Sequence, residues 1–222
     1  MMYDSIRKLF GLTETRGFSE VELAKARQLF GRIPLALELY YRELGRDETL
    51  NRMFNYLMIP WENHCPLEQG YLYIFTENQG VCNWAISLMD LDLEDPPVYA
   101  TYDDIFDKGI DTWALESEKL SDFFIAMAHF HAVYALPFAS EGYYIEKDKA
   151  DSIRNHYKKK CEPTRVWVDG GMEFYGNHAY DSIVLMRAAD GDDYYYDLNY
   201  ASGDQSSFEE MERVMSSLGV AY

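Results

Sequence analysis

The sequence predicts an α+β protein: a mostly antiparallel sheet flanked by helices, with a C-terminal α+β extension. Three observations predict this class. Helical patterns with capping signals come first, strand-like segments joined by short turns follow, and one long apolar helix precedes a second group of strands. Strands joined by short turns pair antiparallel, and strands grouped together, rather than alternating with helices, are typical of α+β folds.

Two helices are predicted before residue 50. Ser19 and Glu22 match a capping box ahead of a run of apolar positions, so the first helix is expected to continue to residue 30. Pro34 fits the first turn of the second helix, where its missing N–H is harmless, and Gly45 is a typical stop signal.

The middle of the chain predicts a meander and then the long helix. Strands are expected over residues 71–75, 81–88 and 98–102. Asn78, Gln79 and Gly80 between the first two form a three-residue hairpin loop. The apolar run from Leu120 to Leu136 predicts a helix that Pro137 ends.

The last third of the chain returns to strands. They are expected over residues 165–168, 172–175, 182–187 and 194–198, in two hairpins. Ser206 and Ser207 are expected to cap a closing helix. In the run of tyrosines at residues 194–196, alternate rings of a strand are expected to point inward and outward.

The order of these elements predicts three regions. An N-terminal helical segment covers residues 1–18, and an α+β domain covers residues 19–137. Residues 138–222 form a strand-hairpin and helix extension that is expected to pack on the same domain.

Charge is concentrated in two acidic blocks. The chain of 222 residues has a formal net charge of −18, with net −9 in residues 90–122 and net −10 in residues 169–212. Residues 146–165 between them carry a net charge of +3. Because nucleic-acid backbones and anionic membranes are bound by Lys and Arg, both are excluded as direct partners. The acidic surface instead indicates a basic protein partner.

The compartment is predicted from the cysteines and from the hydropathy pattern. Three cysteines give no disulfide framework, which favours a reducing environment. The most apolar stretch, residues 123–136, is only 14 residues long, whereas a membrane span needs about 20. No apolar leader segment is visible at the N-terminus, so a cytoplasmic protein is expected.

No metal, cofactor or catalytic centre is expected. His129 and His131 point in different directions on a helix, and the acidic run that starts at Asp90 lacks the glycine and glutamate of a calcium loop. No nucleophile motif surrounds any serine or cysteine. Paired carboxylates among many aromatic rings leave a carbohydrate-acting enzyme as an alternative.

Trp84 has two interpretations. As a core residue, its ring fills the space behind a central strand. As a functional residue, it lines a cleft together with Glu77, Asn78 and Gln79 from the neighbouring turn.

Several segments together resemble the SUKH superfamily, which includes fungal regulators of cell-wall glucan synthesis and many bacterial proteins. The resemblance covers roughly residues 19–137 and lies in the order of these segments: Ile33–Gly45, Tyr71–Phe75, Glu77–Val81, Trp84–Ile86, Asp95–Tyr99 and Ser121–Phe124. It implies an α+β domain with a sheet flanked by helices and no known catalytic residues. It also implies an immunity function, because many bacterial members bind and neutralise the toxin domain of a polymorphic toxin system.

The favoured hypothesis is a non-catalytic immunity protein that occludes the basic site of a cognate toxin. The alternatives are a regulatory or signalling interaction module and, less favoured, a carbohydrate-acting enzyme. Carboxylates placed where phosphates would bind, with aromatic anchors beside them, are the features expected of such an interface. The predicted partner-binding residues are Tyr102, Asp103, Asp104, Asp107, Asp111 and Trp113, together with Glu77, Asn78, Gln79 and Trp84.

Overall fold

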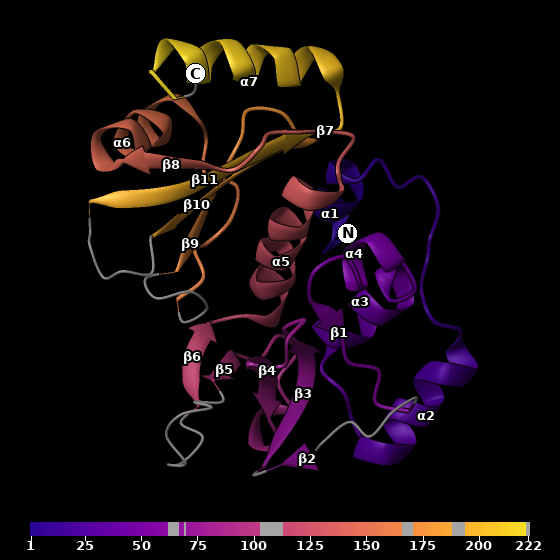
Figure 1. The fold of residues 1–222 in the computed structure, drawn as a ribbon. Coiled ribbons are helices and arrows are strands. Elements are labelled where there is room, and N and C mark those ends of the chain that lie inside the picture. The colour runs from indigo at the N-terminus through magenta and orange to yellow at the C-terminus, as the bar shows by residue number, and fades with distance from the viewer. Residues whose placement is uncertain (62–66, 69, 103–112, 166–170, 188–193, 221–222) are drawn as a thin grey trace. The chain divides into compact units, whose positions relative to one another are not determined.

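The chain folds into two compact units (Figure 1). The computed structural model describes residues 1–61, 67, 68, 70–102, 113–165, 171–187 and 194–220. The first unit comprises Met1–Tyr3 and Glu14–Phe124, and the second comprises Asp4–Thr13 and Ile125–Tyr222. Each unit has its own antiparallel sheet and its own helices, so the α+β class is confirmed. The expected limits at residues 18 and 137 stay a prediction.

The first unit contains three helices ahead of its sheet, and the long helix α5 begins in it. Its elements are α2 (Glu20–Phe30), α3 (Leu35–Leu44), α4 (Glu48–Asn51), β1 (Tyr56–Leu57), β2 (Leu67–Glu68), β3 (Tyr71–Thr76), β4 (Cys82–Ser87), the 3₁₀ helix η1 (Leu88–Asp90), β5 (Val98–Tyr102), β6 (Ala114–Ser117) and the start of α5 (Leu120–Ala135). The strand order is β1-β3-β4-β5-β6, with β2 also paired to β3.

Local signals for the first helices are confirmed. The Ser19 backbone N–H donates to the Glu22 carboxylate at 2.8 Å, and the Ser19 side chain accepts from the Glu22 N–H, which completes the capping box of α2. Helix α3 starts directly after Pro34, and the Gly45 N–H donates to the Tyr41 carbonyl at 3.3 Å.

The hairpin between β3 and β4 is confirmed, but its loop has four residues (78–81) instead of the expected three, because the Glu77 N–H donates to the Cys82 carbonyl at 2.8 Å. The Glu77 carboxylate accepts a hydrogen bond from the Gln79 N–H at 2.7 Å, and the Glu77 carbonyl accepts one from the Gly80 N–H at 2.9 Å. Gly80 has φ +76°, a value that glycine adopts without steric cost. The turn therefore sets the antiparallel pairing of β3 with β4.

Aromatic rings fill the core of the first unit, between one face of the sheet and the helices α3 and α5. Tyr40 stacks on Phe124 with ring centroids 3.8 Å apart. Phe123 contacts both Phe75 of β3, at 6.0 Å, and Trp84 of β4, at 5.8 Å. Tyr40, Phe75, Trp84, Phe123 and Phe124 are all buried, so this inner face of the sheet is closed to solvent.

The second unit has one sheet, three helices and the remainder of α5. Its elements are α1 (Asp4–Leu9), β7 (Phe138–Ala139), β8 (Tyr143–Glu146), α6 (Lys147–His156), β9 (Met172–Tyr175), β10 (Asp181–Arg187), β11 (Tyr195–Ser202) and α7 (Gln205–Ser217). The strand order is β7-β11-β10-β9, and β8 also pairs with β11.

Helices α6 and α7 lie on one face of the second sheet (Figure 1), and their apolar residues form a core with alternate residues of β10 and β11. Tyr196, Leu198 and Tyr200 of β11 belong to this core. The expected alternation is confirmed for Tyr195 and Tyr196, because Tyr196 is buried in this core whereas its half-buried neighbour Tyr195 lies opposite the exposed Glu146; Tyr194 precedes β11.

The N-terminal cap of α7 differs from the expected one. Asp204, rather than Ser206 or Ser207, caps α7, because its carboxylate accepts a hydrogen bond from the Ser207 N–H at 2.9 Å. The expected cap was therefore wrong. The strand expected over 165–168 lies almost wholly outside the described residues.

His129 of α5 is buried in the second unit beside Ser182 of β10. The Ser182 hydroxyl donates to the His129 carbonyl at 2.8 Å, and its oxygen lies 3.1 Å from His129 Nδ1. Burial, and secondarily the Lys160 cation, lowers the pKa of His129 to about 3 from 6.5. The folded chain therefore keeps this imidazole neutral.

We expect this histidine to make stability fall with acidification. Below pH 6.5 the unfolded chain binds a proton that the folded chain does not, so stability is complete above that pH and decreases towards pH 3. The loss is about 1.4 kcal/mol per pH unit, or about 2 kcal/mol at pH 5. Denaturant unfolding of His129→Asn at pH 7 and pH 5 should show a smaller pH-dependent loss, by about that amount. The control variant His156→Asn changes an exposed side chain and should lose as much stability between pH 7 and pH 5 as the wild type. An equal loss in the wild type and in both variants would contradict the role given to His129.

None of the helices in the described ranges is long and apolar enough to cross a membrane.

Candidate functional site

The outer face of the first sheet, opposite the aromatic core, presents a second set of rings. In the register, Tyr73 of β3 lies opposite Ala85 of β4, Ala85 lies opposite Tyr99 of β5, and Tyr99 lies opposite Leu115 of β6. Directly opposed residues in an antiparallel sheet share a face. Tyr71, two residues before Tyr73, lies on this face as well.

Trp113 completes this set of rings. Its ring stacks on that of Tyr71, with centroids 4.3 Å apart and an interplanar angle of 19°, and meets Tyr73 edge-on at 5.4 Å. Tyr71 also contacts Tyr99 edge-on at 5.7 Å. We call Tyr71, Tyr73, Tyr99 and Trp113 the outer aromatic cluster. Tyr73 is buried and the other three are half-buried, so the cluster presents ring surface to solvent.

The Trp113 indole N–H is the one polar group in the cluster that is buried without an acceptor among the described residues. Leaving such a donor unpaired costs about 1–3 kcal/mol.

Carboxylates border the outer aromatic cluster. Burial, followed by the negative charge of Asp90, raises the pKa of Tyr99, and Glu118 contributes in the same direction. Asp90 ends the 3₁₀ helix η1, in which Met89 is 92% exposed. The site thus combines aromatic and aliphatic surface with negative charge, the composition of an anchor for a cationic partner.

Six of the predicted site residues lie between residues 102 and 113, the segment of the chain that ends at this cluster. Trp113 belongs to it directly. Strand β5 ends at Tyr102, whose side chain lies outside what the structure describes. The four predicted aspartates, Asp103, Asp104, Asp107 and Asp111, lie outside the described residues. The acidic segment therefore begins at the end of β5 and ends at the tryptophan of the cluster.

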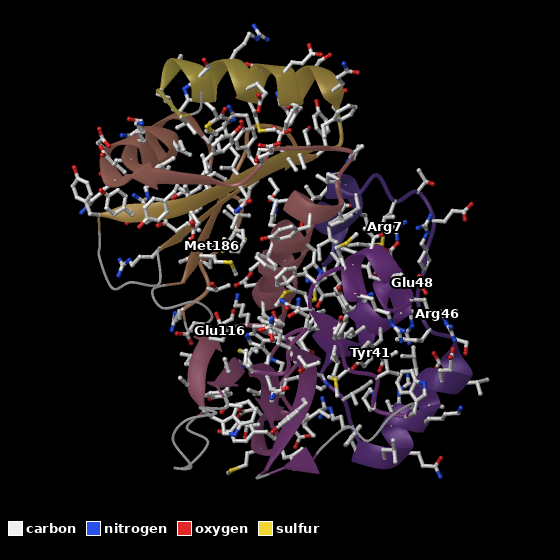
Figure 2. All side chains as sticks on the ribbon, viewed as in Figure 1. Arg7, Tyr41, Arg46, Glu48, Glu116 and Met186 are labelled. Carbon is white, nitrogen blue, oxygen red and sulfur yellow. The ribbon has the colours of Figure 1, made fainter. Side chains whose placement is uncertain are left out.

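The other four predicted site residues are divided between the hairpin tip and the core. Asn78 and Gln79 are exposed at the tip, and Glu77 is buried beside them. Trp84 is fully buried, and its indole N–H lies 3.4 Å from the carboxylate of Glu116, a residue of β6 (Figure 2). Trp84 contacts the inner core, so the structure favours its interpretation as a core residue and does not bring it to a cleft with the turn.

Tyr71, Tyr73 and Tyr99 were not among the predicted site residues. The signal was present, because a strand places residues 71 and 73 on one face and the sequence has tyrosine at both positions. The missing information was the register with β5 and the return of Trp113 to the same face, which depend on contacts between segments remote in sequence.

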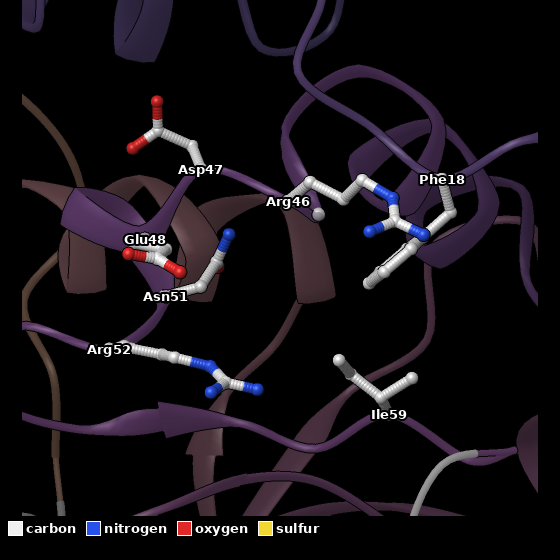
Figure 3. Close-up of a pocket in the computed structure, with 8 residues that line it drawn as sticks. Phe18, Arg46, Asp47, Glu48, Asn51, Arg52 and Ile59 are labelled. Atoms are coloured by element: carbon white, nitrogen blue, oxygen red, sulfur yellow. The ribbon is translucent and has the colours of Figure 1, made fainter.

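A separate cavity of about 140 Å³ lies at the α3–α4 junction (Figure 3). Its lining includes two cationic side chains, Arg46 and Arg52, and two carboxylates, Asp47 and Glu48. Arg46 lies over the Phe18 ring at 5.2 Å and pairs with Glu22. Because the charges of this lining balance, the cavity favours neither anions nor cations.

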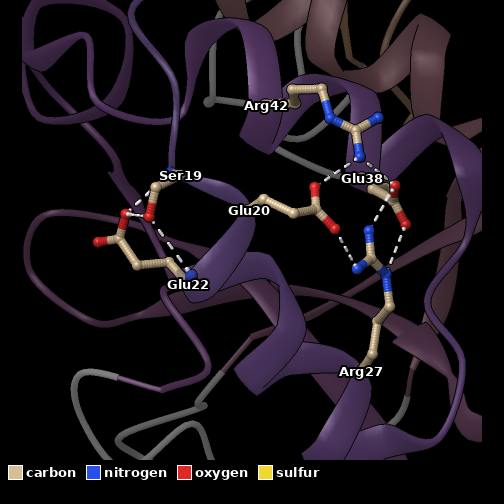
Figure 4. A network of polar contacts seen from close by, with 6 residues as sticks. All are labelled: Ser19, Glu20, Glu22, Arg27, Glu38 and Arg42. Carbon is tan, nitrogen blue, oxygen red and sulfur yellow. Dashed lines mark hydrogen bonds and ion pairs between the residues drawn. The ribbon is translucent and has the colours of Figure 1, made fainter.

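An ion-pair network ties α2 to α3 (Figure 4). Arg27 pairs with Glu20 at 2.6 Å and with Glu38 at 2.8 Å, and Arg42 pairs with the same two carboxylates. The hydrogen bond from Arg27 is the largest cause that lowers the pKa of Glu38. Each charged group of the network has a partner of opposite charge within the network, so the network holds α2 and α3 together.

In the part of the chain that the structure describes, no group of three or more His, Cys, Asp or Glu side chains is arranged to hold a metal ion. Asp95, from the acidic run weighed as a calcium loop, instead accepts hydrogen bonds from the Ser121 N–H and hydroxyl, at 2.8 and 2.6 Å. It fixes the first turn of α5.

Comparison of the chain with protein-family models, with curated proteins and with solved structures found no match. The resemblance to the SUKH superfamily therefore stays a prediction from the segments quoted above.

Proposed function

We propose that this chain is a non-catalytic, cytoplasmic protein-binding module: an immunity protein that neutralises a cognate toxin by covering the toxin's basic site. The observation that carries the proposal is the outer aromatic cluster, which joins half-buried rings to the acidic block of residues 90–122. The resemblance to the SUKH superfamily supports the same function. Cys82 and Cys161, the described cysteines, are not joined to each other in a disulfide, which suits a reducing compartment.

The proposed mechanism has an electrostatic step and a packing step. The acidic block attracts a basic surface over several ångströms and raises the association rate, an effect that salt screens. Trp113 and Tyr71 then supply flat apolar area that is desolvated on contact, which is typical of residues that dominate interface energies. A toxin whose cationic cleft faces this surface loses access to its own substrate.

The test uses the protein captured by this chain from the native host, purified and shown to bind directly. Simultaneous Asp103→Lys, Asp104→Lys and Asp107→Lys substitutions should lower the association rate at low salt at least about tenfold, because the attraction becomes repulsion. The difference from the wild type should shrink at high salt. Stopped-flow mixing measures both rates.

The matched control reverses three exposed carboxylates of the second unit, Asp148→Lys, Glu209→Lys and Glu210→Lys, and so changes the net charge equally. Equal slowing in the control and the test variant would show a non-specific charge effect. An unchanged rate in the test variant would remove the acidic segment from the interface. Turnover of a substrate by the purified chain, abolished by one side-chain substitution, would contradict the non-catalytic proposal.

A further inference from the structure

Tyr144, Tyr194 and Tyr195 cluster on the second sheet, away from the core that α6 and α7 cover; Tyr144 and Tyr194 are exposed, and Tyr195 is half-buried. In the pairing of β8 with β11, Ile145 opposes Tyr196, and both belong to that core. Tyr195 opposes Glu146 in the same register, so this tyrosine and this glutamate share the other face. Tyr144 precedes Ile145 and lies on the face of Tyr195 as well.

The rings form a corner. Tyr144 stacks on Tyr195 with centroids 4.8 Å apart and an interplanar angle of 15°. Tyr194 stands nearly perpendicular to Tyr195, at 5.1 Å and 77°. Tyr144 is 56% exposed and Tyr194 is 51% exposed, so the corner presents ring surface to solvent. We call Tyr144, Tyr194, Tyr195 and Glu146 the tyrosine corner.

Glu146 gives the corner a negative charge. It is the N-cap residue of α6, but its exposed side chain makes no capping hydrogen bond. None of the described residues forms an ion pair with it, and none places a cation over the Tyr195 ring. A carboxylate next to exposed π-faces is complementary to an organic cation, which rings attract through their quadrupole.

The same strand shows the matching chemistry on its buried side. The Arg154 guanidinium lies 4.7 Å from the Tyr196 ring centroid and donates through Nε and one terminal nitrogen to the Glu173 carboxylate, at 3.0 and 2.6 Å. A tyrosine ring and the two oxygens of the Glu173 carboxylate thus hold one arginine side chain there, together with Asp151, which pairs with Arg154 at 2.6 Å. The tyrosine corner contains the same two kinds of group, a ring and a carboxylate, on the opposite face of this sheet.

We propose that the tyrosine corner binds an arginine side chain in an exposed, basic segment of a protein partner. The flat guanidinium stacks on Tyr195 or Tyr144 and donates a pair of hydrogen bonds to Glu146, which a lysine ammonium cannot match in geometry. This surface is separate in sequence from the outer aromatic cluster, and the proposal does not depend on the immunity function.

The experiment titrates the full chain with short peptides of one sequence that carry arginine, lysine or citrulline at the same positions. The arginine peptide should bind about tenfold more tightly than the citrulline peptide, and more tightly than the equally charged lysine peptide. Tyr195→Leu and, separately, Glu146→Gln should each weaken arginine binding by about fivefold to tenfold. Isothermal titration calorimetry measures the affinities, and Tyr195→Phe should retain most of the binding because the ring persists.

The control is Tyr56→Leu, which removes an exposed ring of the first unit and should leave the affinity unchanged. Equal affinity for arginine and citrulline peptides, or unchanged arginine binding in both Glu146→Gln and Tyr144→Leu, would overturn the proposal. Glu146→Gln alters only an exposed side chain, so it keeps the test valid if Tyr195→Leu fails to fold. Ring-dependent binding of neutral oligosaccharides without arginine binding would assign the corner to carbohydrate instead.

Discussion

Replacing Trp84 with alanine is expected to lower the free energy of unfolding by about 4 kcal/mol. The side chain is fully buried, and removing a buried Trp leaves a cavity that the surrounding structure only partly fills. Its neighbour Phe123, 5.8 Å away, would lose its contact with the indole ring. The Glu116 carboxylate, buried on β6, would lose a donor as well. Urea denaturation followed by circular dichroism measures the change.

Two comparisons make this result specific. Trp84→Phe keeps most of the ring volume and should cost about half as much. Tyr56→Ala removes an exposed ring and should cost less than about 1 kcal/mol. A loss below about 1 kcal/mol for Trp84→Ala, with impaired partner binding, would contradict the core role and restore the interpretation of this tryptophan as a contact residue.

Replacing Asp181 with alanine is expected to have an effect of similar size in the second unit. Its buried carboxylate accepts hydrogen bonds from the Ser202 hydroxyl at 2.9 Å, the Ser207 hydroxyl at 2.7 Å and the His178 N–H at 2.9 Å. These bonds join the start of β10 to the end of β11 and to α7. Without the carboxylate, two buried hydroxyls and one backbone N–H lose their acceptor, at a combined cost of about 4 kcal/mol.

Thermal and urea unfolding of Asp181→Ala test this expectation against Asp148→Ala as a control. Asp148 is exposed on α6, and its carboxylate accepts a local hydrogen bond from the Lys149 N–H at 2.9 Å, so loss of this side chain should cost less than about 1 kcal/mol. The double variant Ser202→Ala/Ser207→Ala should also have a lower free energy of unfolding than the wild type, because it leaves the Asp181 carboxylate buried with fewer donors. Equal stability of Asp181→Ala and the wild type would show that this cluster does not hold the unit together.

The elements with local signals were predictable from sequence. Each of these signals depends on contacts within a few residues of sequence, so nearby atoms decide the local structure. They are the capping box at Ser19, the proline before α3 and the turn at Gly80. Helix α6 was not predicted, because its sequence is almost entirely polar and only Ala150 and Ile153 are buried. Its position depends on the apolar core shared with α7 and β11, which no local pattern encodes.

The candidate sites were likewise predictable from sequence only in part. Acidic composition and exposed aromatic residues were visible in the sequence, but the stacking of Trp113 on Tyr71 depends on two segments about forty residues apart. The burial of Trp84 and the pairing of Glu146 with Tyr195 likewise follow from strand register. Register is decided by long-range packing, which a single sequence does not reveal.

Hydroxyl-radical footprinting with and without the purified partner tests the proposed interface most directly. Oxidation of Trp113, Tyr71 and Tyr99 should fall several-fold in the complex, because their half-exposed rings would be desolvated, while Tyr56 should react at an unchanged rate. Undiminished oxidation of all three outer rings in a fully formed complex would contradict the proposal that this chain binds its partner through the outer aromatic cluster.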